Sequence, residues 1–113
     1  MAVDVAKHLE RAKRYLEKNK LQDAIEAYQA VLEASPNHQE AIQVLGDLHV
    51  RVNEPERAAT YYGMLFDRMT DPREEPKALA IYARFLKPYQ PAPERMARYA
   101  LLLQRHEKVE EAI

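Results

Sequence analysis

The sequence predicts an all-α fold of antiparallel helical hairpins, with about six or seven helices in total. Three segments repeat one polar helix–turn–helix junction: LEKNKLQDAI (16–25), VRVNEPERAA (50–59) and QRHEKVEEAI (104–113). Ala24 and Ala58 take the same place in the first two junctions and are 34 residues apart. The chain has only two glycines, and Ala, Leu, Glu, Lys and Arg, which favour helices, are abundant. Short polar turns between such helices join antiparallel neighbours.

The first hairpin is expected over about residues 5–38. Asn19 is suited to the left-handed conformation that ends a helix, and Pro36 closes the hairpin. Apolar residues recur at helical spacing along both helices: Leu9, Ala12, Leu16, Leu21, Ala24, Ile25, Tyr28, Val31 and Leu32.

The second hairpin is expected over about residues 39–72. Gly46 takes the place of the earlier small residue, and Asn53 recurs at the helix end. Pro55 then falls where the first turn of a helix tolerates a missing amide. His49 occupies the slot that holds a tyrosine in the first hairpin, so we interpret it as a packing residue.

Residues 73–92 break the period. They contain a helical pattern, PKALAIYARFLK (76–87), followed by the proline-rich PYQPAP, which is typical of a stiff extended connector. Two arrangements stay open. Residues 74–87 and 93–106 form a degenerate third hairpin before a further helix, or 76–87 is an inserted helix and 93–113 a partial third repeat. The match of the third junction to the others favours the second arrangement.

The recurring positions resemble the tetratricopeptide repeat (TPR), whose period is 34 residues. The matching slots run Ala12, Tyr15, Ala24, Tyr28, Leu32 and Pro36; then Gly46, His49, Ala58, Tyr62, Phe66 and Thr70; then Ala100, Leu103 and Ala112. His8 and Arg11 depart from the pattern, which expects large apolar residues there. The resemblance covers roughly two-thirds of the chain. It implies a right-handed solenoid and a scaffold for protein–protein interaction, and the length of 113 residues predicts a single domain.

The resemblance also implies a concave face, lined by the first helix of each pair, that receives a peptide or helix of a partner protein. Helical geometry nominates Leu9, Lys13, Glu17, Gln43, Asp47, Val50, Arg51, Ala97, Leu101 and Arg105 for this face. Some family members clamp a peptide carboxylate with Lys, Asn and Arg, but here Leu9 and Val44 stand at such positions. We therefore expect Lys13 and Arg51 to anchor an acidic or carboxylate-bearing segment instead.

Residues for catalysis are scarce, so we do not expect an enzyme. The chain has no cysteine, and Ser35 is explained as a helix-end hydroxyl. Gly46 and Gly63 lie within predicted helices and do not form a phosphate-binding loop. The His38-x-Glu40 pair lacks further ligands for a metal. We expect no metal, no cofactor and no small-molecule substrate.

Charge and hydropathy restrict the class of partner. The formal net charge is −1, so no global field attracts nucleic acid, although the basic first helix keeps such contact open as an alternative. The chain lacks a long apolar run and a signal-peptide layout, so we expect a cytoplasmic protein without membrane insertion.

The final segment carries an apolar pattern, Val109, Ala112 and Ile113, without a polar closing helix. We interpret the chain as a fragment of a longer protein. Two other hypotheses are a docking module for the protein's own domains and a homo-oligomer formed through the C-terminal end, with Tyr99, Leu102 and Leu103 uncovered.

Overall fold

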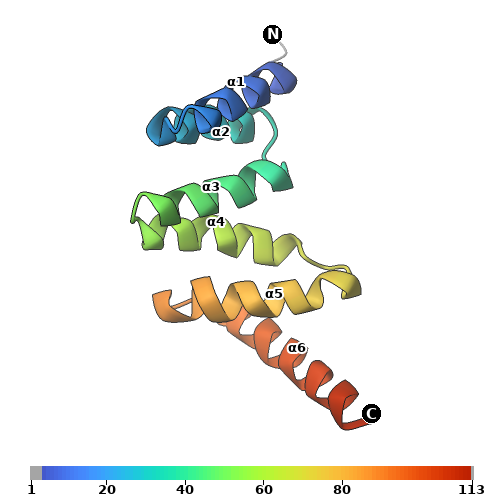
Figure 1. The fold of residues 1–113 in the computed structure, drawn as a ribbon. Coiled ribbons are helices and arrows are strands. Elements are labelled where there is room, and N and C mark those ends of the chain that lie inside the picture. Colours follow the sequence, from blue (N-terminus) through green and yellow to red (C-terminus); the bar gives the residue numbers. More distant parts are fainter. Residues whose placement is uncertain (1–3, 113) are drawn as a thin grey trace. The chain divides into compact units, whose positions relative to one another are not determined.

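The computed structural model describes residues 4–112, and the side chains of residues 4–107. Its α-helices are α1 (Val5–Glu17), α2 (Leu21–Ala34), α3 (Gln39–Arg51), α4 (Pro55–Arg68), α5 (Glu75–Ile81) and α6 (Pro93–Ala112) (Figure 1). Three short turns flank α5: η1 (Pro72–Glu74), the π-helical η2 (Tyr82–Leu86) and η3 (Lys87–Tyr89). The described residues form no strand, so the predicted all-α class is confirmed.

Contacts divide the chain into two compact units, residues 1–61 and 62–113. Helix α4 passes through the boundary, giving its first half to unit 1 and its second half to unit 2. The prediction of a single domain over the whole chain stays a prediction.

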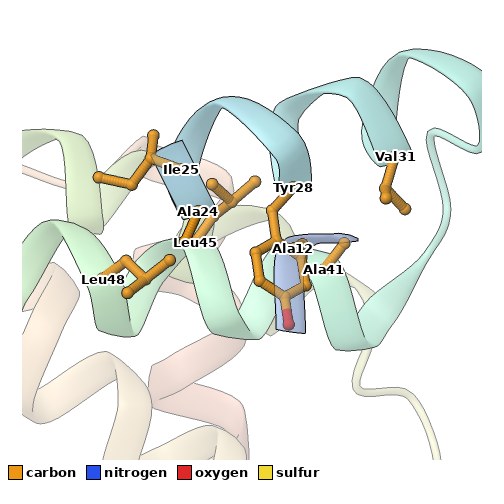
Figure 2. Packing of buried hydrophobic residues seen from close by; sticks show 8 residues of the cluster. All are labelled: Ala12, Ala24, Ile25, Tyr28, Val31, Ala41, Leu45 and Leu48. Carbon is orange, nitrogen blue, oxygen red and sulfur yellow. The ribbon is translucent and has the colours of Figure 1, made fainter. Parts of the chain in front are cut away.

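The core of unit 1 combines α1, α2 and α3 (Figure 2). Its buried members are Ala12, Ala24, Ile25, Tyr28, Val31, Ala41, Leu45 and Leu48. Ala12 and Ala24 are fully buried, and their small side chains let helix backbones approach closely. Each fully buried Leu or Ile contributes about 1.5–3 kcal/mol of transfer free energy, so this cluster holds α1, α2 and α3 together.

The helix ends in unit 1 follow the predicted asparagine pattern. Asn19 and Asn53 have positive φ angles of 57° and 61°. After α1, Lys20 N donates to Tyr15 O and Asn19 N to Leu16 O, at 2.9 and 3.0 Å. The same pair of bonds recurs after α3, from Glu54 N and Asn53 N. These are Schellman motifs, which satisfy carbonyls at a helix end through a left-handed residue.

The third predicted junction, residues 104–113, is not a junction. Helix α6 continues through it to Ala112. Glu107 stands where Asn19 and Asn53 stand in the first two, and a left-handed conformation is unfavourable for glutamate. The predicted turn is therefore wrong, because the segment repeats the charges and apolar residues of a junction without the residue that makes the turn.

Unit 2 contains a hairpin of α5 with η2 against α6. The ring centres of Tyr82 and Tyr99 lie 4.1 Å apart. Glu75 is the first residue of α5, and its Oε2 lies 3.2 Å from Nε2 of His106, in the C-terminal half of α6. Contacts that advance along one helix and retreat along the other show that the two run antiparallel. This is the first of the two arrangements left open, without the further helix.

Other aromatic rings join α4 to this hairpin within unit 2. Tyr62 stacks on Phe85 at 3.9 Å, and Phe66 meets Tyr82 at 5.5 Å. The connector after η2 is less extended than predicted, because Lys87–Tyr89 forms a 3-10 turn and Gln90 has a φ of 51°.

The apolar residues near the C-terminus that were expected to be exposed are buried or half-buried where their side chains are described. Leu102 is buried, and Tyr99 and Leu103 are half-buried. The side chains of Val109, Ala112 and Ile113 lie outside the described residues. Within the described part of the chain, no helix has the length and apolar character needed to cross a membrane.

Candidate functional site

Two side-chain contacts connect α1 and the turn after it to α3 in unit 1, and we call the predicted groove residues of these two helices the α1/α3 face. Lys13 Nζ lies 3.4 Å from Glu40 Oε1, and Arg51 Nη2 donates to Asn19 Oδ1 at 3.3 Å. The first contact joins α1 to α3, and the second joins the turn after α1 to the last residue of α3, so the contacts advance in the same direction along both segments. The two helices are therefore parallel neighbours. The members of this face are Leu9, Lys13, Glu17, Gln43, Asp47, Val50 and Arg51.

The side chains of this face combine exposed charges with modest apolar area. Lys13, Glu17, Asp47 and Arg51 are exposed. Val50 is 42% exposed although it is a large apolar residue. Leu9 is half-buried and packs against the core of unit 1, and Gln43 is half-buried as well. The face thus offers two cations, two acids and apolar contact area.

The two cations of the face are held weakly. The Lys13 and Glu40 side chains are each about half exposed, and an exposed ion pair stabilises a fold by about 0–1 kcal/mol. Arg51 contacts a neutral amide at 3.3 Å, near the upper limit for a hydrogen bond. Both cations can therefore leave these contacts at little cost in stability.

The remaining predicted groove residues, Ala97, Leu101 and Arg105, lie on α6 in unit 2. All three are exposed, and Arg105 Nη2 lies 3.0 Å from Glu75 Oε1. Helix α6 is the second helix of its hairpin, whereas the prediction placed these three residues on the first helix of a partial third repeat over residues 93–113. A binding face that joins them to α1 and α3 stays a prediction.

His49 is buried, as its slot in the repeat predicted. It is 2% exposed and stacks on Tyr61 at 5.4 Å. Its Nδ1 lies 3.2 Å from Glu54 Oε1, which favours the tautomer that donates from Nδ1. Its Nε2 is buried and has no hydrogen-bond partner among the described residues. A shallow groove of about 240 Å³ runs beside it, lined by Gln29, His49, Arg57, Thr60 and Tyr61.

The basic character of the first helix is concentrated on one exposed side. Lys7, Arg11, Arg14 and Lys18 recur at helical spacing and are all exposed. Arg14 Nη2 lies only 2.7 Å from Glu10 Oε1, so part of this charge is already paired. The arrangement is that of a solvated helix face stabilised by pairs one turn apart.

Two arginines of α6 that were not predicted from the sequence hold unit 2 together. Arg95 forms a forked pair with Asp67, with bonds of 3.0 and 2.8 Å, and this hydrogen bonding raises the pKa of Arg95. Its guanidinium covers Gly63, where an added Cβ would lie 2.7 Å from Nη1. Arg98 donates to the carbonyl oxygens of Phe66 and Met69. The only signal in the sequence is that both arginines recur on the side of α6 that carries Leu102.

The described side chains include no group of three or more His, Cys, Asp or Glu residues placed to hold a metal ion. Comparison with known families gave a match to the tetratricopeptide repeat over residues 15–85. This span, more than half of the chain, runs from the end of α1 to η2 and confirms the resemblance. Repeats of this family are generally protein–protein interaction modules, typically without catalytic activity. No curated protein matched the chain.

Proposed function

Because this chain belongs to the tetratricopeptide repeat family, we propose that it binds an acidic or carboxylate-bearing segment of a partner protein on the α1/α3 face. The observation that carries the proposal is that Lys13 and Arg51 are exposed and weakly held. Both cations are exposed on parallel helices, and each is held by a single weak contact at 3.4 or 3.3 Å. They are thus available to a ligand without the loss of a strong interaction.

The two cations suit different parts of a ligand. Arg51 uses a guanidinium nitrogen on Asn19, and its planar group has further donors for a bidentate bond to a carboxylate. Lys13 acts as a compact charge with three donors, so it accepts a carboxylate in several orientations. Val50 and Leu9 supply apolar area for a ligand side chain.

The acids of the face restrict which segments bind. Glu17 and Asp47 are exposed on the same face as the two cations. A ligand acid placed beside either of them is repelled, whereas one placed at Lys13 or Arg51 is attracted. Unfavourable placements of this kind set register and exclude uniformly acidic segments.

A displayed library of random peptides with free C-termini tests the proposal. The wild-type protein serves as bait, and enriched peptides are synthesised and titrated by fluorescence anisotropy. We expect peptides with one or two acids, and we expect the variant K13E/R51E to bind them at least about tenfold more weakly, because two attractive contacts become repulsive.

The matched control is K7E/R57E, which makes the same change in net charge. Lys7 and Arg57 are exposed and lie in the first turns of α1 and α4, where an acid is compatible with the helix dipole. This variant should bind like the wild type. Equal weakening by the two double variants would show a non-specific charge effect, and unchanged binding by K13E/R51E would exclude the α1/α3 face.

A further inference from the structure

Helix α6 has a second side that is apolar except for one glutamine, and we call it the outer face of α6. It consists of Met96, Ala97, Ala100, Leu101 and Gln104, of which Met96 and Leu101 are 53% and 61% exposed. By helical geometry this side lies opposite the one that packs on α5 through Tyr99 and Leu102. A surface helix usually carries polar residues there. The uncovered apolar residues therefore indicate a further contact.

Two residues of opposite charge border the outer face of α6 at symmetric positions. Glu94 and Arg105 are about three helical turns apart and lie along the same edge of the face. They are also at nearly equal distances from Ala100 along the helix. When two such helices pair antiparallel with a twofold axis near Ala100, Glu94 of one copy lies opposite Arg105 of the other, and this happens twice.

We propose that the outer face of α6 binds the same face of a second copy of this chain, with the two α6 helices antiparallel. An isologous contact of this kind requires a self-complementary surface, and the opposite charges of Glu94 and Arg105 supply one. In this register Leu101 lies beside Ala97 of the other copy, so that a large side chain meets a small one. Small residues near the axis allow close approach of the two helices.

The existing contact of Arg105 is compatible with this pairing. Its guanidinium lies 3.0 Å from Glu75, and its side chain is 62% exposed. An arginine has five donors, so Arg105 can contact Glu75 and a second carboxylate together. Because the apolar area is limited and association costs translational entropy, we expect a weak, concentration-dependent dimer.

Charge reversal with mixing tests this geometry. By sedimentation velocity over a hundredfold dilution series, we expect the wild type to form a dimer at the highest concentrations. E94R and R105E should each weaken the dimer at least about tenfold, because each places like charges opposite one another. An equimolar mixture of the two variants should restore a heterodimer, because each of its two contacts then joins an arginine of one copy to a glutamate of the other.

Two further variants separate this contact from a loss of folding. The double variant E94R/R105E should dimerise with itself, because it restores opposite charges between the two copies. It still carries a glutamate in place of Arg105 beside Glu75, so its dimerisation would show that this local change does not prevent folding. E56R, on an exposed residue of α4, should dimerise like the wild type.

A wild type that stays monomeric at all concentrations would overturn the proposal and leave the outer face of α6 for another segment. Dimers insensitive to E94R and R105E, or a mixture that fails to associate, would exclude this antiparallel register.

Discussion

Asn19 and Asn53 take the same left-handed backbone conformation, at φ angles of 57° and 61°, at the ends of α1 and α3. Each asparagine N–H, together with the N–H of the next residue, donates to a carbonyl oxygen of the preceding helix. Since asparagine and glycine tolerate this conformation and other residues do so poorly, the two positions determine where each hairpin turns.

We predict that Asn53→Ala destabilises the fold by about 1 kcal/mol, because alanine is strained at positive φ. Asn53→Gly should leave stability nearly unchanged, since glycine adopts this conformation freely. Urea unfolding followed by circular dichroism measures both. An alanine variant as stable as the glycine variant would show that the conformation of residue 53 does not limit stability.

The first two hairpins were predictable because their signals are local. The spacing of small residues and the turn asparagines lie close together in sequence, and both were found where expected. The third junction failed on a single position, where Glu107 replaces asparagine and α6 continues. Similarity over ten residues therefore did not compensate for the missing turn residue.

Contacts between helices were not predictable from the sequence. The groove residues Lys13 and Arg51 were identified from helical spacing, but their partners are distant in sequence: Glu40 lies on α3, and Asn19 lies in the turn after α1. Arg98 was missed for the same reason, because its acceptors are the carbonyls of Phe66 and Met69. Such contacts depend on how one helix is placed along another, which no local pattern determines.

Ala58 provides a test of helix packing. It is 1% exposed and occupies the slot of the fully buried Ala24. We predict that Ala58→Leu destabilises the protein by about 1–3 kcal/mol, because a larger side chain overpacks a close contact. The urea midpoint measures the change, and Ala80→Leu, on an exposed residue of α5, is the control. Equal midpoints for these two variants would contradict close packing at Ala58.

Arg98 provides a test of how unit 2 is held together. Its guanidinium binds carbonyls at the end of α4 and lies 4.5 Å from the centre of the Phe66 ring. We predict that Arg98→Met destabilises unit 2 by about 1.5–3 kcal/mol, because it leaves carbonyl groups without their charged donor. Arg98→Lys should recover only part of this, because an ammonium lacks the planar fork. Amide hydrogen exchange in α5 and α6 measures both.

The control for this prediction is Arg84→Met. Arg84 is exposed, and its guanidinium lies 5.1 Å from the centre of the Phe85 ring. This variant removes a cation–ring contact at an exposed site, so exchange should change little. A loss as large as that of Arg98→Met would attribute the effect to the ring contact and not to the carbonyl bonds.

The buried tyrosines predict a loss of stability at high pH. Burial raises the pKa of Tyr28, with a further contribution from the charge of Glu40, and burial likewise raises the pKa of Tyr82. The ordinary pKa of tyrosine is about 10. The folded protein therefore keeps these protons at a pH where the unfolded chain releases them. The stability that these two tyrosines contribute is fully present below about pH 10, and it is lost as the pH rises through their pKa values in the folded protein.

Tyr28→Phe isolates one of these protons. Above about pH 10, the free energy of unfolding of this variant should fall less steeply, by up to about 1.4 kcal/mol per pH unit, because one fewer proton is released on unfolding. Urea unfolding at pH 8 and at several values above pH 10 measures the slope. Tyr89→Phe, on a residue that is 40% exposed, is the control and should keep the wild-type slope. Identical slopes for all three proteins would show that Tyr28 ionises equally in the folded and unfolded chains.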